Sequence, residues 1–327
     1  MTAVVSPPES GPLGNGETRS RDRWGDRAFR VVTLAAGLLV LVILALIAWT
    51  TTSKAWPAFQ HEGISFVTST NWDPGNDQFG ALDFIYGTIL SSAIAIILAV
   101  PLALGIALFV TEIAGRRLRT GVTYIIDLLA AIPSVVFGYW ALQVFTQPAA
   151  RFYQHIADTI GTLPVLDRFF AAPVHGESFM TAGIILAVMI TPIITSLGRE
   201  VLLTVSQEDK NAAIAMGATR WEMLRVTVFP RVRSGLIGAV MLGLGRALGE
   251  TIAVALVIGG NHQITSHLFQ TGDSMAAVIA HNFGEATGLQ RSALIGLGVV
   301  LFGLTIIINM IARGIANRTT REAASGL

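Results

Sequence analysis

Long apolar runs separated by short polar segments dominate this sequence. A helix that crosses a bilayer needs about 20 mostly apolar residues. The windows that meet this requirement are Val31–Thr51, Ile85–Val110, Val122–Phe145, Thr181–Leu203, Leu236–Gly259 and Ser292–Ile311. The hydropathy pattern therefore predicts an all-α membrane protein with six transmembrane helices.

The segments around these windows indicate the domain organisation. Residues 1–28 are rich in Pro, Gly, Ser and charge, which predicts a disordered tail. Residues 29–83 hold the first helix and an unusually long outer loop, which either contacts a binding protein or only caps the bundle. Residues 84–313 hold the other five helices, with a polar loop at 204–234, and residues 314–327 form a second tail.

Arginine and lysine are divided unequally between the two sides of the predicted membrane domain. The N-terminal tail, alternate loops and the C-terminal tail hold 17 of the 22, the opposite side holds four, and Arg246 lies inside the fifth window. The positive-inside rule therefore predicts that both termini are cytoplasmic. The first apolar run lacks a small-residue cleavage site, so we expect an anchoring helix rather than a cleaved signal peptide.

Composition supports the membrane class and excludes several chemistries. Hydrophobic residues make up 52% of the chain and charged residues 13%, against about 25% charged in soluble domains. The sequence has no Cys, which excludes disulfides and thiolate metal sites. Neither lysine, Lys54 or Lys210, follows a glycine, so the chain has no Walker A loop for ATP. The net charge of +1 does not indicate a nucleic-acid partner.

The polar loop between the fourth and fifth windows begins with the signals of a short helix. Ser206 with Asp209 fits a capping box, and Glu208 adds negative charge to the first turn. Gly217 is a natural C-terminal stop for a helix that starts there. The pattern predicts one short helix on the cytoplasmic face, ending at a glycine elbow.

A second short helix is predicted directly after the elbow. Thr219 with Glu222 fits another capping box, and Pro230 is expected to end this helix. The plain alternative is an ordinary amphipathic surface loop. Two consecutive capping boxes around a glycine favour the helix–elbow–helix interpretation.

A charged pair interrupts the fifth apolar window, "MLGLGRALGETIAVALVIGG". Arg246 and Glu250 are spaced to share one face of a helix. Arginine at the centre of a membrane helix costs roughly 2.5–3.5 kcal/mol, so we expect the pair to face protein or water. Either it is a structural ion pair that locks two helices, or Arg246 attracts an anion in transit, with Glu250 as its counter-ion and Thr251 beside them.

Other polar residues inside the windows carry less weight. Asp127 is expected to form hydrogen bonds in the bundle interior. Ser134, after Pro133, could offer a hydroxyl or a freed backbone amide to an anion. Glu112 is expected at the cytoplasmic interface. The histidines at 155, 175, 262, 267 and 281 fall in outer loops without metal-ligand spacing, which indicates surface residues.

The polar loop resembles a motif of permease subunits of ATP-binding-cassette (ABC) importers. That motif has Glu-Ala-Ala, a glycine after three residues, and Ile-x-Leu-Pro after nine more. The matching positions here are Asn211-Ala212-Ala213, Gly217 and Thr227-Val228-Phe229-Pro230, with Asn in place of Glu. The resemblance implies that the first short helix is a coupling helix that docks on a separate ATPase subunit, with Glu208 or Asp209 supplying charge in place of the missing glutamate.

Three further stretches resemble the PstC family of phosphate importer permeases. They are "PLALGIALFVTE" from Pro101, "IPSVVFG" from Ile132 and "GLGRALGETIAVALVIG" from Gly243. The resemblance implies a type I ABC importer permease bundle without catalytic residues or cofactors of its own. ATP and Mg would bind a PstB-like ATPase dimer. A PstA-like second permease and an extracytoplasmic PstS-like phosphate-binding protein would complete the importer.

Within this family, phosphate gives Glu250 a second role. As an acceptor it would tolerate phosphate, which carries protons near neutral pH, and repel fully ionised sulfate. Two alternatives stay open: a permease for molybdate, sulfate or an organic substrate, and a membrane component that signals phosphate status. An intramembrane enzyme is disfavoured, because no His lies in any window and the fifth helix offers only one Arg and one Glu.

Overall fold

The computed structural model describes residues 18–159, 161, 163 and 166–325, with side chains from residue 25 to residue 314. The chain divides into two compact units, Met1–Thr50 and Thr51–Leu327. Helix α1, Thr18–Glu62, begins in the first unit and ends in the second. Part of the predicted tail, residues 1–17, lies outside the described residues, but residues 18–28 are helical.

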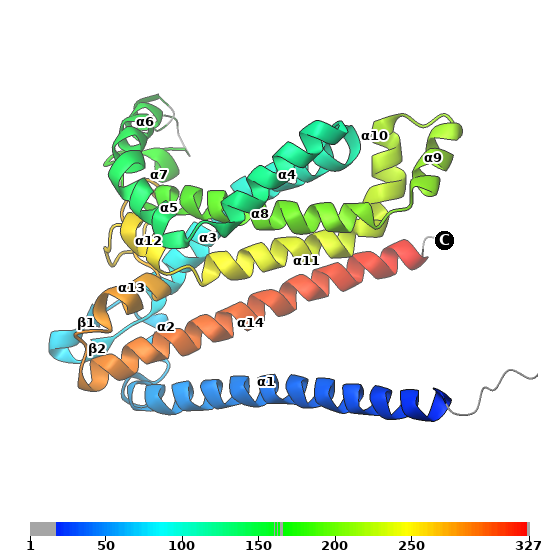
Figure 1. Cartoon of the computed structure of the whole chain (residues 1–327). Helices are drawn as coiled ribbons and strands as arrows, with labels where there is room; N and C mark the ends of the chain where they lie inside the picture. Colours follow the sequence, from blue (N-terminus) through cyan, green and yellow to red (C-terminus); the bar gives the residue numbers. More distant parts are fainter. Residues whose placement is uncertain (1–17, 160, 162, 164–165, 326–327) are drawn as a thin grey trace, which may run out of the picture. The chain divides into compact units, whose positions relative to one another are not determined.

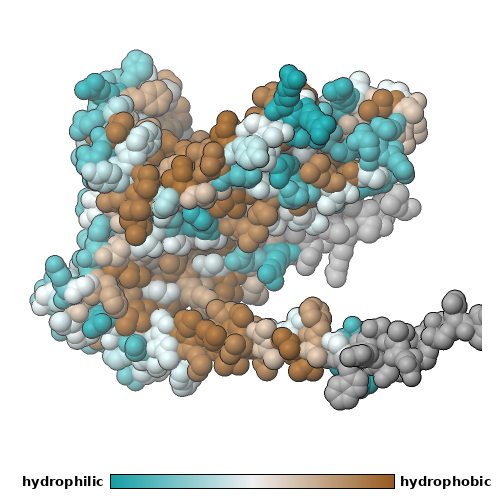
Figure 2. Space-filling view, viewed as in Figure 1, coloured by the Kyte–Doolittle hydropathy of each residue, from teal (hydrophilic) through white to brown (hydrophobic). Residues whose placement is uncertain are grey.

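The first unit consists of the apolar part of α1. Its large side chains from Val31 to Ile47 are exposed, and they form a continuous hydrophobic surface in Figure 2. A helix with apolar residues on every side suits a lipid environment rather than water. The expected anchoring helix at Val31–Thr51 is therefore confirmed as a helix, and it is longer than the hydropathy window.

The second unit is almost entirely helical. In chain order its elements are α2 (Ser65–Thr68), β1 (Trp72–Asp73), η1 (Pro74–Asn76), β2 (Gln78–Phe79), α3 (Leu82–Leu108), η2 (Phe109–Ile113), α4 (Arg116–Ala131), α5 (Ser134–Trp140), η3 (Ala141–Phe145), α6 (Thr146–Thr159), α7 (Asp167–Phe170), α8 (Phe179–Leu203), α9 (Gln207–Ala215), α10 (Arg220–Met223), η4 (Leu224–Val228), α11 (Phe229–Leu248), α12 (Ile252–Val257), α13 (Met275–Asn282) and α14 (Gly288–Ser325). Strands β1 and β2 form a small antiparallel hairpin with Trp72 opposite Phe79. Hydrophilic residues gather around α9, α10 and the start of α4, and around α6, with hydrophobic residues between them (Figures 1 and 2).

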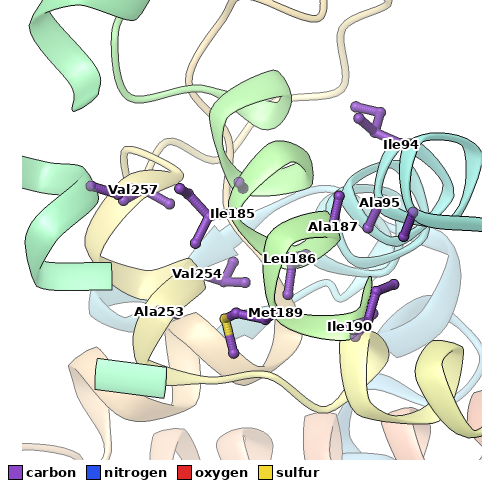
Figure 3. Packing of buried hydrophobic residues seen from close by; sticks show 14 of the residues in the cluster. Ile94, Ala95, Ile185, Leu186, Ala187, Met189, Ile190, Ala253, Val254 and Val257 are labelled. Carbon is purple, nitrogen blue, oxygen red and sulfur yellow. The ribbon is translucent and has the colours of Figure 1, made fainter. Parts of the chain in front are cut away.

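The core of this unit lies where α3 packs against α8. Alanines recur along α3 at 95, 99, 103 and 107, all fully buried. Small residues let membrane helices approach closely, and Gly183 of α8 shows this directly, because a Cβ there would lie 2.4 Å from Ile94. Figure 3 shows α3, α8 and α12 contributing side chains to the same cluster, among them Ala95, Leu186 and Val254. The α3–α8 pair is thus the centre of the core, and α11 and α12 pack against it.

The membrane spans agree with the sequence windows in number but not in continuity. Within the described residues, five helices are long and apolar enough to cross a membrane, and a bent pair raises the number to six if it counts as one span. That pair is Arg116–Ala131 with Ser134–Thr159, bent by 88°. The predicted continuous helix Val122–Phe145 is therefore wrong, because Ile132 and Pro133 have extended backbone and α5 starts in a new direction.

Two corrections concern the fifth window. The predicted helix Leu236–Gly259 is interrupted, since α11 ends at Leu248 and α12 begins at Ile252. Pro230 does not end the second short helix. It stands at the start of α11, directly after the π-helical turn η4, and the longer helix continues past it. The helix runs from Arg220 to Leu248 through the π-helical turn η4.

Candidate functional site

Two interrupted helices pack against each other in the second unit. Helix α5 begins after the bend at Pro133, and α12 begins after the segment Gly249–Thr251, called here the helix break. They are in contact and lie side by side in Figure 1. A Cβ on Gly138 would lie 2.6 Å from the Cα of Ala253, so only glycine permits this approach. Interrupted helices are where membrane transporters expose backbone groups and side chains to a substrate.

Arg246 and Glu250 stand on either side of the end of α11. Arg246 lies in its last turn and is exposed, whereas Glu250 lies in the helix break and is half-buried. The Glu250 carboxylate accepts a long hydrogen bond, 3.4 Å, from the backbone N–H of Ala253 in α12. The predicted sharing of one helix face is wrong, because the helix ends before Glu250. Among the described residues, no ion pair involves either side chain.

The other predicted path residues border the same contact. Thr251 is half-buried and donates a hydrogen bond from its hydroxyl to the Gly249 carbonyl at 3.2 Å. Ser134 is the first residue of α5 and also half-buried, four residues before Gly138, or about 6 Å along the helix. Glu250 and Thr251 precede Ala253 by three and two residues. The structure therefore places Ser134, Glu250 and Thr251 within about one helical turn of the α5–α12 contact.

The exposed guanidinium of Arg246, at the end of α11 directly before the helix break, has a clear chemical capacity. Arg246 keeps its charge at any physiological pH and offers paired donors that match a tetrahedral oxyanion. Since Glu250 is held by α12 rather than by Arg246, no carboxylate of the described residues neutralises the cation. An intramembrane charge without such a partner is a candidate to bind a ligand or a second subunit.

The polar loop at 204–234 has the predicted helix–elbow–helix structure. Ser206 caps α9 by accepting from the Asp209 N–H at 3.2 Å. Gly217 has φ +95°, a conformation that favours glycine. The Thr219–Glu222 capping box is complete, with the Thr219 N–H donating to the Glu222 carboxylate at 2.8 Å. The two helix starts, the glycine elbow and the second capping box are confirmed. Of the first predicted capping box, the hydrogen bonds of the described residues include the Ser206 cap but not the reciprocal bond from the Ser206 N–H to Asp209.

The faces of α9 separate the residues of the predicted docking motif. Asn211 and Ala212 are exposed, as is Glu208, whereas Ala213 is buried against the bundle. The elbow carries exposed apolar side chains, with Met216 85% and Trp221 63% exposed. An exposed apolar group rimmed by charge marks a protein contact site.

Sequence reasoning missed two ion pairs that hold α9 to the bundle. The Lys210 ammonium lies 2.6 Å from the Glu112 carboxylate, with the Lys210 side chain buried and the Glu112 side chain 14% exposed. Asp209, predicted only as a docking charge, also pairs with Arg231 near the start of α11. Glu112 was expected at the interface, and nothing in the local pattern points to a partner 98 residues away. The one available signal is that Lys210 is one of only two lysines in the chain.

Two other expectations on polar residues need correction. Asp127 is exposed on α4, a helix without buried residues, and does not lie in the interior of this chain. His262 is not a free surface residue, because its ring packs edge-on against Phe84 with centroids 4.9 Å apart. Its Nδ1 lies 3.8 Å from the Asp83 carboxylate, and partial burial lowers the pKa of His262.

The neighbouring Asp273 is also buried at this end of the bundle. Burial, helped by the nearby charge of Asp83, raises the pKa of Asp273 to about 7. Its Oδ1 accepts from the N–H of Ser274, which in turn caps α13. These outer carboxylates belong to the packing of the loop before α13 against α3, and they lie on elements other than those of the helix break.

Comparison with known sequences places the chain in one family along most of its length. Residues 99–321 match the family described as binding-protein-dependent transport system inner membrane component. A phosphate transport system permease protein PstC of Xylella fastidiosa is 43% identical over 98% of this chain and 99% of its own length. The PstC of Mesorhizobium japonicum is 44% identical over 88% of this chain and 89% of its own length. The protein named PstC 2 of Mycobacterium tuberculosis is 41% identical over 90% of this chain and 92% of its own length.

Solved structures agree with the fold. An inward-facing MetNI methionine ABC transporter superposes with a TM-score of 0.55 at 18% identity, over 72% of this chain and 94% of that one. A bacterial alginate ABC transporter in complex with an alginate-bound periplasmic protein superposes with a TM-score of 0.54 at 17% identity, over 91% of this chain and 98% of that one. These likenesses support the ABC importer permease bundle predicted from the sequence. The chain belongs to the family of binding-protein-dependent transport system inner membrane components and, within it, groups with the phosphate transport permeases named PstC.

Proposed function

We propose that this chain is one of two permease subunits of an ATP-driven phosphate importer. The observation that carries the proposal is Arg246 in the last turn of α11, directly before the helix break, where it is exposed and has no ion-pair partner among the described residues. The identity of 41–44% to phosphate permeases supports phosphate over molybdate or sulfate. A signalling role would act through partners and is compatible with transport.

A single chain supplies only half of the proposed path. Arg246 and much of α5 are exposed, and α4 has no buried residue, so these surfaces need a partner or lipid. We assign the other half to a homologous, PstA-like permease. A PstS-like binding protein delivers phosphate from outside, and a PstB-like ATPase dimer binds ATP and Mg.

The loop at 204–234 is the proposed contact with the ATPase. Its exposed residues, Glu208, Asn211 and Ala212 on α9 and Met216 at the elbow, would occupy a groove on that subunit. ATP binding would then bring the two permeases into an outward-facing state, and hydrolysis would release phosphate inside. This assignment puts the loop and both termini in the cytoplasm, as the distribution of arginine and lysine predicts.

Uptake of phosphate by reconstituted vesicles tests the role of Arg246. Arg246→Gln removes charge-assisted hydrogen bonds worth about 1.5–3 kcal/mol, so we expect ATP-dependent uptake to fall about 10- to 100-fold. Arg246→Lys keeps the charge without the paired donors, so its uptake should lie between those of the wild type and Arg246→Gln. The matched control is Arg116→Gln, an exposed arginine at the start of α4. Unchanged uptake by Arg246→Gln would remove Arg246 from the path.

The same vesicles test the selectivity proposed for Glu250. Glu250→Gln keeps an acceptor for the N–H of Ala253 and removes the negative charge. We expect uptake of phosphate to persist and its preference over sulfate to drop, because the repulsion of a dianion is lost. If preference and rate both match the wild type, Glu250 is only a helix cap.

A further inference from the structure

The short coupling helix α9 has a buried anchor on the bundle. It has nine residues, too few to be stable alone, so tertiary contacts must hold it. Lys210 and Ala213, three positions apart on one face, are its buried residues. Ala213 packs in a cluster with Ala107 near the end of α3 and with Leu202 of α8, and Lys210 reaches Glu112 beyond α3.

The Lys210–Glu112 pair is buried and close. The Nζ–Oε1 distance is 2.6 Å, with the side chains only 5% and 14% exposed. A buried charge that loses its partner is strongly unfavourable, so the pair holds one geometry. By contrast, Asp209 and Arg231 are 40% and 53% exposed, and a pair in solvent contributes little. The buried pair is therefore the stronger of the two attachments of α9.

Glu112 is itself in a joint that is fixed from a second direction. It lies in the π-helical turn η2, which ends this helix, and the last carbonyls of a helix have no partner within it. The Arg119 guanidinium donates to the carbonyls of Val110 and Thr111 at 2.8 and 2.7 Å. Cations from α4 and α9 thus hold the same turn. The turn that follows α3 is therefore held in place at the point where α9 is attached to it.

Displacement of this joint would reach the helix break through packed side chains. Helix α3 continues from η2 into the core, where Ala95 and Ala99 pack in one cluster with Ile190 of α8 and Val254 of α12 (Figure 3). Val254 lies four residues after Glu250. Close-packed interiors transmit displacement because they contain few voids.

We propose that Lys210 and Glu112 are positioning residues that join α9 and the end of α3 into one body, so that motion of the coupling helix moves α3 toward or away from the path. This rests on the proposed function. The pair does not touch phosphate or ATP. Its contribution is to make ATP hydrolysis productive.

The ratio of phosphate transported to ATP hydrolysed tests this in vesicles that contain the complete importer. For Lys210→Gln and for Glu112→Gln we expect the assembled complex to hydrolyse ATP while the ratio falls about tenfold or more. Exchanging the charges, with Lys210→Glu and Glu112→Lys together, should restore most of it. The matched control is Glu200→Gln, which removes an exposed carboxylate that pairs with half-buried Arg199 at the same end of the bundle and should leave the ratio unchanged.

A covalent link provides the second test, because the chain has no cysteine of its own. Lys210→Cys with Glu112→Cys should be uncoupled when free, and a short bifunctional thiol reagent should raise the ratio again by replacing the ion pair. A link that abolishes transport shows that α9 slides on α3 and overturns the inference. The inference is also overturned if the single variants transport as much phosphate per ATP hydrolysed as the wild type. It is equally overturned if the charge-exchanged double variant has no higher ratio than the single variants. Wild-type vesicles that move no phosphate would instead overturn the proposed function.

Discussion

Arg246 and Glu250 lie four residues apart, yet the backbone gives them different surroundings. The N–H of Glu250 makes a long 3.4 Å bond to the Ala247 carbonyl as α11 ends, and its side chain turns to α12. Gly249 in the break lowers the local helix propensity by about 1 kcal/mol relative to Ala. The end of the helix thus separates Arg246 from the carboxylate four residues later, and no carboxylate of the described residues pairs with its guanidinium.

Asp273 should make stability depend on pH. Burial raises the pKa of Asp273 from 3.8 to about 7, so the folded protein keeps a proton that the unfolded chain loses above about pH 4. Stability is therefore expected to fall as pH rises from about 4 to 7 and to level off above that. The variant Asp273→Asn should exceed the wild type in melting temperature by about 2 °C or more at pH 8, and hardly at all below about pH 4.

Thermal unfolding of the purified protein at several pH values checks this. Glu285→Gln, at an exposed carboxylate near the end of α13, serves as the control and should follow the wild-type curve. Equal melting temperatures of Asp273→Asn and wild type at pH 8 would mean that Asp273 is not strained by its charge.

At the level of helices, the apolar runs were predictable and their interruptions were not. Thr181–Leu203 agrees with α8 within two residues, because a continuous apolar run with a capped start allows one conformation. Pro133 and Pro192 look alike in sequence, but only Pro133 accompanies a sharp bend, since α8 is held in the core on both sides of Pro192. Whether a break forms depends on neighbouring helices, which a local pattern does not contain.

The α5–α12 contact gives an element-level prediction. Gly138→Ala would place a methyl group 2.6 Å from the Cα and 3.2 Å from the carbonyl oxygen of Ala253, so one backbone must move. We expect phosphate uptake to fall at least about tenfold with the complex still assembled, since a misplacement of about 1 Å at a site is costly. Uptake per copurified complex is the measurement.

Gly245→Ala is the matched control for that substitution. Gly245 lies next to Arg246, and nothing stands within 4 Å of an added Cβ in this chain. If Gly138→Ala takes up phosphate as well as the wild type, the close approach of α5 and α12 is not needed for transport.

For the molecule as a whole, class and family could be predicted from the sequence, whereas the arrangement of the site could not. The predicted path residues Ser134 and Thr251 lie more than one hundred positions apart, and the packing of α5 on α12 brings them near one contact. The motif around Gly217 was predictable because caps and a positive φ are local properties. The pairing of Lys210 with Glu112 depends on tertiary structure, so no local signal could reveal it.

The orientation predicted from the charge distribution can be measured on single-cysteine variants of this cysteine-free chain. Asn76 in the β1–β2 turn and Arg220 at the start of α10 are both exposed. In intact cells, Asn76→Cys should react with a membrane-impermeant thiol reagent, and Arg220→Cys should react only after permeabilisation. The reverse pattern would invert the proposed topology and put the elbow on the wrong side for an ATPase.

The continuity of the helix from Arg220 to Leu248 has a mechanical consequence. Its 29 residues form a rod about 43 Å long, with the elbow at Gly217 next to one end and Arg246 near the other. By simple lever geometry, a tilt of about 5° about one end moves the opposite end by about 4 Å, more than the length of a hydrogen bond. If the elbow contacts an ATPase as proposed, a small pivot at that end would suffice to engage or release the proposed anion at Arg246, with no melting or refolding of the helix itself.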